Sequence, residues 1–124
     1  MILVDTSVWI DHLHRSEPML VTLLSRSLVG QHPMVVGELA LGTLKDRTDL
    51  LGSLAGIPSL EVASHDEVLV LVEERRLWGK GLSLVDAHLI ASVLLTSGAT
   101  LWTRDNRLRA VADDLGLTYP AGKF

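Results

Sequence analysis

The sequence predicts an open α/β fold in which helices cover a mostly parallel sheet. Strand-like and helix-like segments alternate along all 124 residues. The run 1–4 is apolar without alternation, which is typical of a strand that is buried on both faces. The segment 87–95 is apolar nearly all round, so we expect it to form a central helix.

The first half of the chain is expected to form three strands and four helices. The strand 1–5 leads into Asp5-Thr6-Ser7, whose side chains suit the N-cap of a first helix. A second helix begins near Pro18 and is ended by Gly30. A brief strand, or the approach to one, is expected at 33–36, and another strand at 59–63, with helices at 37–44 and 49–54 between them.

Two capping boxes mark helices in the second half. Ser64 with Glu67, and Ser83 with Asp86, have the S-x-x-[DE] spacing of such boxes. The sequence Gly79-Lys80-Gly81 separates the two helices. A last helix is expected between strands at 99–103 and 117–119.

The composition is that of one globular domain. Apolar residues make up 48% of the chain and charged residues 21%, so intrinsic disorder is not expected. The absence of cysteine excludes a disulfide scaffold, a thiolate metal site and a cysteine nucleophile, and it is compatible with the cytoplasm. The net charge of −4 argues against a protein that coats nucleic acid. Neither a signal peptide nor a membrane span is expected.

Four acidic side chains are expected to meet at one edge of the sheet. Asp5 ends the first strand, and Glu38 follows the second strand at a helix start. Asp86 lies in the first turn of the central helix, and Asp105 follows the strand 99–103. Ligands of open α/β sheets bind beyond the carboxyl ends of the strands, where these acids would converge. Taken singly, each acid could instead cap a helix or complement a helix dipole.

A convergent set of carboxylates requires protonation or a cation. Two carboxylates ~4 Å apart repel by about 4 kcal/mol at an effective dielectric constant of about 20. Oxygen ligands without thiolates suit a hard cation such as Mg²⁺ or Mn²⁺. Such an ion keeps part of its water shell, and this suits chemistry on phosphoryl groups.

Four short motifs, in order along the chain, resemble those of the PIN-domain ribonucleases. They are ILVDTSVWI at 2–10, VGELALG at 36–42, LSLVDA at 82–87 and TRDN at 103–106. Their spacing and the chain length resemble especially the VapC toxins of prokaryotic toxin–antitoxin pairs. The resemblance implies a single PIN-like domain over 1–124, with three α/β/α layers and a mostly parallel five-stranded sheet.

The resemblance also implies an Mg²⁺- or Mn²⁺-dependent endoribonuclease. Asp5 and Asp86 would be the principal metal ligands, Asp105 would complete the cluster, and Glu38 would act through water. Supporting polar groups would come from Thr6, Ser7, Thr103 and Asn106. Many relatives carry a further acid or a phenylalanine just after the fourth motif, and the chain departs from them by having Asn106 and Leu108.

Partners follow from the same resemblance. It implies an RNA substrate, a small VapB-type antitoxin that occupies the acidic cleft, and a homodimer. Trp9, Trp78 and the leucines of 20–28 are candidate protein contacts, with core packing as the alternative. Candidate contacts to RNA phosphates, with a solvated face as the alternative, are Lys80, Arg104 and Arg107.

Two other functions stay open at this point. One is a catalytically inactive PIN-like binding module that keeps the fold and the partner surface. The other is a Mg²⁺-binding receiver domain of similar size, which would carry paired acids after the first strand, where only Asp5 stands. His88 is expected to be packed or hydrogen-bonded, because it does not share a helix face with Asp86.

Overall fold

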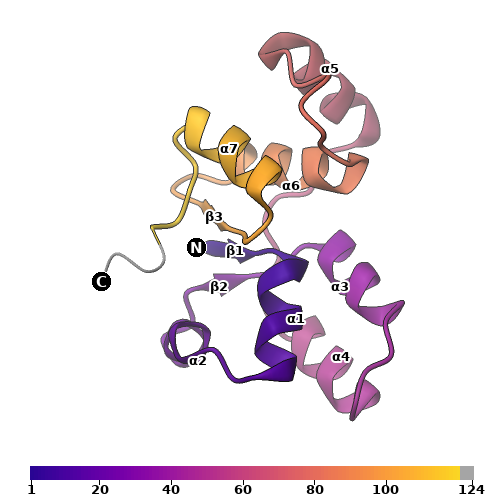
Figure 1. Ribbon diagram of the computed structural model, residues 1–124, viewed down its shortest axis with the longest axis vertical. Helices are drawn as coiled ribbons and strands as arrows, with labels where there is room; N and C mark the ends of the chain where they lie inside the picture. The colour runs from indigo at the N-terminus through magenta and orange to yellow at the C-terminus, as the bar shows by residue number, and fades with distance from the viewer. Residues whose placement is uncertain (121–124) are drawn as a thin grey trace.

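The fold is built around a parallel sheet of three strands in the order β2–β1–β3 (Figure 1). The computed structural model describes residues 1–120. The strands are β1 (Ile2–Val4), β2 (Val29–Gly30) and β3 (Thr100–Trp102). In the central strand β1, Ile2 pairs with Val29 on one side and with Thr100 on the other. All three residues of β1 are buried, as the unbroken apolar run predicts.

Two single bridges extend the sheet at its edges, where the sequence predicts full strands. Gln31 bridges to Ser59 beside β2, and Leu101 bridges to Thr118 beside β3, both in parallel. The expectation of five strands is therefore wrong in extent, since 59–63 and 117–119 each contribute one bridge. Pro58 and Pro120 stand next to these bridges, and a proline has no N–H with which to prolong a ladder.

The expected strand at 33–36 is a helix instead. These residues open α3 (Pro33–Ala40), where His32 is the N-cap and its Nδ1 accepts a hydrogen bond from the Met34 N–H at 3.0 Å. Proline at the first helical position needs no hydrogen-bond partner and has a helical φ already. The strand lies earlier, at β2, so the preceding helix α2 (Pro18–Ser25) ends five residues before Gly30.

Gly30 is required by close packing within the sheet. A Cβ placed on it would lie 2.3 Å from Leu60 Cδ1 and 2.5 Å from Met1 Sδ. Any larger residue would push these side chains apart. The glycine that the sequence suggests as a helix stop is thus a strand residue that lets two neighbours approach.

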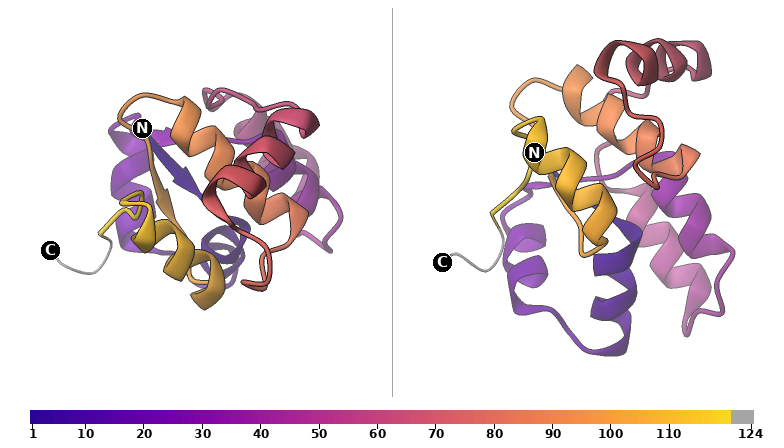
Figure 2. Two further views of the ribbon diagram at one scale, coloured as in Figure 1. Left: turned by 90° about the horizontal axis from the view of Figure 1, so that it is seen from above. Right: turned by 45° about the horizontal axis from the view of Figure 1, so that its top comes forward.

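The helices lie on both sides of the sheet, as expected for a three-layer arrangement. Figures 1 and 2 show α1 (Thr6–His14), α2, α3 and α4 (Arg47–Ala55) on one side. The other side carries α5 (His65–Arg75), α6 (Leu84–Leu95) and α7 (Asn106–Asp114). No helix within residues 1–120 is long and apolar enough to cross a membrane.

Helix α6 is the central helix that its sequence predicts. All seven residues from Ala87 to Val93 are buried, and His88 and Ser92 are among them. Both capping boxes form: Glu67 N–H donates to Ser64 Oγ at 3.1 Å, and Asp86 N–H donates to Ser83 Oγ at 3.1 Å. The second box fixes the first turn of α6 at the carboxyl edge of the sheet.

Candidate active site

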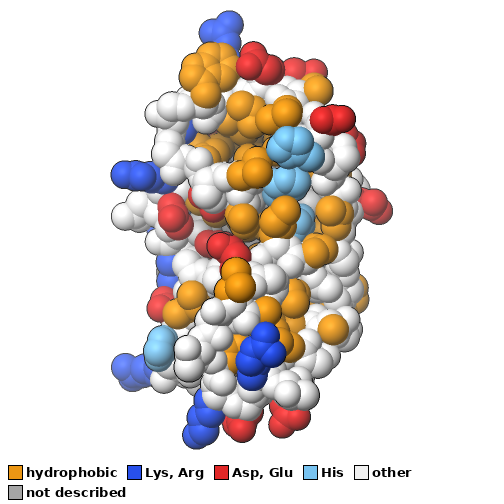
Figure 3. All heavy atoms as spheres, turned by 90° about the vertical axis from the view of Figure 1, so that its right-hand side faces the viewer, with side chains coloured by type: hydrophobic (Ala, Val, Ile, Leu, Met, Phe, Trp, Pro, Cys, Tyr) orange, Lys and Arg blue, Asp and Glu red, His pale blue; other side chains and the backbone are white. Residues whose placement is uncertain are grey.

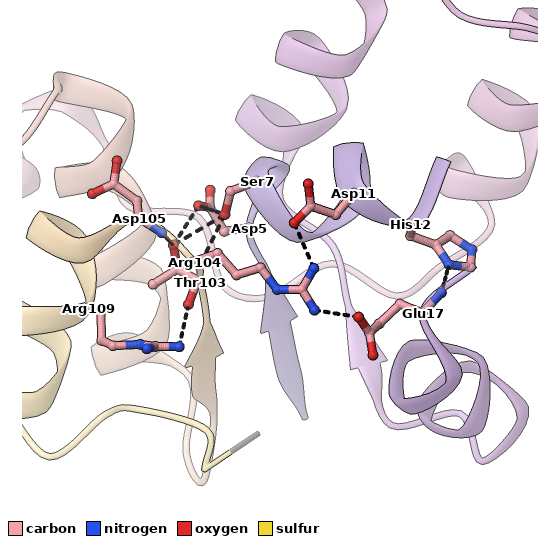
Figure 4. Close-up of polar contacts among 9 residues, drawn as sticks. All are labelled: Asp5, Ser7, Asp11, His12, Glu17, Thr103, Arg104, Asp105 and Arg109. Carbon is pink, nitrogen blue, oxygen red and sulfur yellow. Dashed lines mark hydrogen bonds and ion pairs between the residues drawn. The ribbon is translucent and has the colours of Figure 1, made fainter. Parts of the chain in front are cut away.

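Asp5 is the buried centre of the site. It follows β1, caps α1, and is only 6% exposed. Its Oδ1 accepts a hydrogen bond from the Thr6 N–H at 2.8 Å. Its Oδ2 accepts hydrogen bonds from Ser7 Oγ at 2.8 Å and from Thr103 Oγ1 at 2.7 Å (Figure 4). Three donors therefore fix the carboxylate in one orientation without balancing its negative charge with a cationic side chain.

Thr103 joins the first and fourth motifs. Because Val4 pairs with Trp102, the residues that follow them, Asp5 and Thr103, lie side by side at the same sheet edge. Thr103 is 1% exposed, and its Oγ1 also accepts a hydrogen bond from the Asp105 N–H at 3.1 Å. A single buried hydroxyl thus links the backbone of Asp105 to the carboxylate of Asp5.

Asp105 is an exposed N-cap at the start of α7. Its Oδ1 accepts hydrogen bonds from the N–H groups of Arg107 and Leu108, at 2.9 and 3.0 Å. The capping interpretation is therefore correct for this acid. It does not exclude membership of the acidic cluster, because both cap bonds use the same carboxylate oxygen.

The pKa of Asp86 is raised above its ordinary value. Burial is the main cause that raises the pKa of Asp86, and hydrogen bonds from Ser83 oppose it. The negative charges of Asp5 and Asp105 raise this pKa further. Asp86 Oδ2 also accepts a hydrogen bond from the Ser83 N–H at 3.0 Å. Asp86 is thus both the capping-box acid and a member of the cluster.

Glu38 reaches the cluster from its margin. It lies in the second turn of α3, so the prediction that it stands at a helix start is wrong. The interpretation of Glu38 as an acid that complements the helix dipole is wrong for the same reason. Its Oε1 accepts a hydrogen bond from Thr6 Oγ1 at 2.8 Å. Thr6 is the residue whose N–H binds Asp5, so one threonine connects the two acids.

The donor chemistry of this edge fits a hard divalent cation. The acids come from four separate segments, and a cation would relieve the repulsion that raises the pKa of Asp86. Within residues 1–120, however, no three acidic or histidine side chains lie close enough together to ligate one ion directly. This arrangement suits Mg²⁺, which keeps several waters and binds proteins through one or two carboxylates.

Arg104, a predicted RNA contact, pairs with two acidic side chains of its own chain. Its Nη1 pairs with Asp11 Oδ2 at 2.7 Å, and its Nη2 pairs with Glu17 (Figure 4). Its guanidinium lies 5.8 Å from the Trp102 ring centroid. Hydrogen bonds that Arg104 donates to the carboxylates of Glu17 and Asp11 raise the pKa of Arg104. The residue ties the end of β3 to α1 and the start of α2.

The other predicted polar residues have different surroundings. Arg107 lies against the loop at Gly81, since a Cβ on that glycine would be 2.6 Å from Arg107 Cδ. Lys80 is exposed in the same loop, and Asn106 is the exposed first residue of α7. Ser7 supports two motifs, because its Oγ donates to Asp5 and accepts from the Arg104 N–H at 3.1 Å.

Sequence reasoning missed a cluster of three histidines from three helices. The ring centroids of His32 and His88 are 6.5 Å apart, and those of His65 and His88 are also 6.5 Å apart. Figure 3 shows histidines among hydrophobic side chains on this face. His88 is buried, as expected, and burial followed by the charge of His88 lowers the pKa of His32 to about 4. The three positions are far apart in sequence, so no local pattern signals them.

The chain is similar to known proteins over nearly all of its length. The family model of the PIN domain matches residues 2–114. Ribonuclease VapC32 of Mycobacterium tuberculosis, from strains CDC 1551 / Oshkosh and ATCC 25618 / H37Rv, is 54% identical over 117 residues, which is 94% of each chain. These matches exclude the receiver-domain alternative and confirm the resemblance drawn from the four motifs. The chain belongs to the PIN-domain family and is a homologue of the VapC ribonucleases.

Proposed function

We propose that the protein is a toxin of the VapC type that hydrolyses RNA phosphodiester bonds with Asp5, Glu38, Asp86 and Asp105. The observation that carries this proposal is that the Thr103 hydroxyl links Asp5 to the backbone of Asp105 at the sheet edge, where the charges of both aspartates act on Asp86. A carboxylate with a raised pKa, among other acids at the carboxyl edge of a parallel sheet, is typical of a functional site. The similarity to a protein named as a ribonuclease supports the reaction class.

Asp5, Asp86 and Asp105 would hold Mg²⁺ or Mn²⁺ at this edge partly through water molecules, because the three carboxylates do not all lie close enough together to ligate one ion directly. The ion supplies a Lewis acid for the phosphodiester and lowers the pKa of a bound water. Glu38, exposed at the margin, is placed to accept a proton from an attacking water. Its hydrogen bond from Thr6 keeps the carboxylate turned toward the Asp5 side of the cluster.

The hydroxyls of Ser7 and Thr103 position the principal ligand. Both donate to the same oxygen of Asp5, and both are anchored by backbone N–H groups, of Arg104 and of Asp105. Because each hydroxyl has its donor and acceptor roles assigned, the Asp5 carboxylate is held in one rotamer before any ligand arrives. Binding then requires little reorganisation at this residue.

The test is RNA cleavage by purified wild type, Asp86→Asn and Asp5→Asn, with Asp49→Asn as control. Asp49 is an exposed acid in the first turn of α4, outside the cluster. Wild type and Asp49→Asn should cut RNA when Mg²⁺ or Mn²⁺ is added and stop when EDTA is added. The two cluster variants should stay folded by circular dichroism and lose cleavage. Retained cleavage in both would refute the assigned site.

An inactive PIN-like binding module is the alternative that this experiment also addresses. Such a module would show no cleavage by clean wild-type protein with either metal. The four acids and their hydrogen-bonded support favour an active enzyme, because a module without catalysis has no need for mutually repelling carboxylates. The cytoplasm is the expected place of action.

Two protein partners belong to the proposal. A VapB-type antitoxin with an arginine would complement the acidic cluster by charge. A second copy of the chain would cover the apolar groove of about 420 Å³ between α5 and α6, which includes Val70, Leu71 and Leu95. Light scattering of the isolated chain tests the homodimer, and a monomer at all concentrations would contradict it.

A further inference from the structure

A second, smaller pocket lies beside the acidic cluster, in the connection between α5 and α6. Its volume is about 260 Å³, enough for several water molecules at about 30 Å³ each. Leucine side chains and an indole supply most of its wall, from Leu77, Trp78, Leu82 and Leu84. The pocket is thus an apolar depression within a loop rather than a polar cleft.

Trp78 is exposed, in contrast to the other tryptophans. It is 57% exposed, whereas Trp9 and Trp102 are 5% and 3% exposed. Leu84, on the same pocket, is 52% exposed. Core packing is therefore the correct interpretation for Trp9 but not for Trp78. Large exposed apolar side chains that gather at a depression indicate a binding surface.

A hydrogen bond places this pocket next to Asp86, and the Arg107 side chain connects it to the start of α7. Ser83 belongs to the pocket wall, and its N–H donates to Asp86. Gly81 also belongs to the wall, and the Arg107 side chain lies directly against it. The backbone N–H of that same arginine donates to Asp105. The pocket consequently adjoins Asp86, and Arg107 connects it to the start of α7, where Asp105 is the N-cap.

Two cations lie near the pocket: Lys80 stands in the loop between the wall residues Gly79 and Gly81, and the Arg107 side chain packs against Gly81. The acidic cluster alone repels a polyanion, so an RNA strand needs positive charge close to the place where it is cut. An exposed indole with neighbouring cations is the combination that binds single-stranded nucleic acid, because bases stack on the ring while phosphates pair with the charges.

We propose that this pocket binds a nucleobase of single-stranded RNA next to the scissile phosphate, with Trp78 stacking on the base and Arg107 pairing with a phosphate. The proposal rests on the proposed nuclease function and deepens it. The wall offers few polar groups, and the Ser83 hydroxyl already accepts a hydrogen bond from Asp86 N–H. Stacking without hydrogen-bond readout accepts every base, so this subsite favours unpaired RNA and does not select a sequence.

The test compares wild type with Trp78→Ala, Trp78→Phe and Leu41→Ala, where Leu41 is an exposed control residue. The probes are a short single-stranded RNA and a ribose-phosphate oligomer of the same length without bases, both in EDTA to prevent cleavage. RNA should quench the fluorescence of wild type, and Trp78→Ala should bind RNA about tenfold more weakly. Trp78→Phe keeps a stacking ring and should bind within about threefold of wild type. Leu41→Ala should equal wild type, and the oligomer without bases should bind wild type and Trp78→Ala equally.

Three outcomes overturn the proposal. Equal RNA affinity of Trp78→Ala and wild type would do so while leaving the nuclease function intact, because cleavage is scored separately with Asp86→Asn. A change in molecular mass of Trp78→Ala by light scattering, with unchanged RNA affinity, would assign the pocket to a protein interface. A wild type that neither binds nor cuts RNA would remove the nuclease function and this subsite together.

Discussion

Acid should destabilise the protein through one buried histidine, His32. The side chain is 0% exposed, and its Nδ1 must be unprotonated to accept the hydrogen bond from Met34 N–H that caps α3. Within residues 1–120, its Nε2 is buried with no hydrogen-bond partner. Burial, and secondly the charge of His88, lower the pKa of His32 to about 4. Protonation of this ring therefore works against the native structure.

The sign and size of the effect follow from linkage. The unfolded chain binds the proton near pH 6.5 and the folded chain near pH 4, so the free energy of unfolding falls as the pH drops through this window. The difference corresponds to about 3 kcal/mol, which is fully lost below pH 4. Asp86 acts in the opposite sense, since its raised pKa means that the folded state binds that proton more readily as the pH falls.

The variant His32→Asn isolates this contribution. Asparagine is a good N-cap residue and does not titrate, so the cap of α3 is kept while the proton is removed from the balance. His14→Asn is the matched control, because His14 is an exposed histidine in the last turn of α1. The measurement is urea unfolding of the three proteins by circular dichroism at several pH values between 7 and 4.

Wild type and His14→Asn should lose about 3 kcal/mol more than His32→Asn over this range. Absolute stability at pH 7 is not the criterion, because the smaller asparagine leaves a gap of its own. The reasoning is refuted if His32→Asn and wild type lose the same free energy of unfolding on acidification.

Three further changes test the site and its supports. Asp86→Asn should raise the Tm in EDTA by calorimetry, because it removes a half-buried charge that is repelled by Asp5 and Asp105, and a lower Tm would contradict the electrostatic account. Gly81→Ala should lower the free energy of unfolding by at least about 1 kcal/mol, because the φ of Gly81 is +77° and the new Cβ would meet the Arg107 side chain. Unchanged urea unfolding of this variant would contradict the prediction. Arg104→Gln should cost at most about 1 kcal/mol, because its ion pairs are partly exposed, and a much larger loss would show that these pairs are stronger than surface pairs usually are.

The parts of the fold that were predicted correctly are those with local signals. The apolar run of β1 and the capping boxes of α5 and α6 each lie within a few consecutive residues, and the structure keeps all of them. Pro33 carries a local signal too, but the prediction of a strand or its approach at 33–36 is wrong, because Pro33 is the first residue of α3. The predicted lengths of the two edge strands are wrong for another reason, because the extent of strand pairing depends on neighbours distant in sequence.

In the candidate site, too, some features could be predicted from the sequence and others could not. The convergence of Asp5, Asp86 and Asp105 could be predicted, because the topology of a parallel sheet places its strand ends together. The ion pairs of Arg104 with Asp11 and Glu17 could not be predicted, since they join residues 93 and 87 positions apart. The histidine cluster was missed for the same reason, as each of its members comes from a different helix.

Titration of the protein with Mn²⁺ by calorimetry tests most directly whether the carboxylate cluster is a metal site. Wild type and Asp49→Asn should bind the ion with equal affinity, and the affinity of Asp86→Asn should be lower by at least about tenfold. Absence of uptake by wild type, or equal affinity of wild type and Asp86→Asn, would contradict the account.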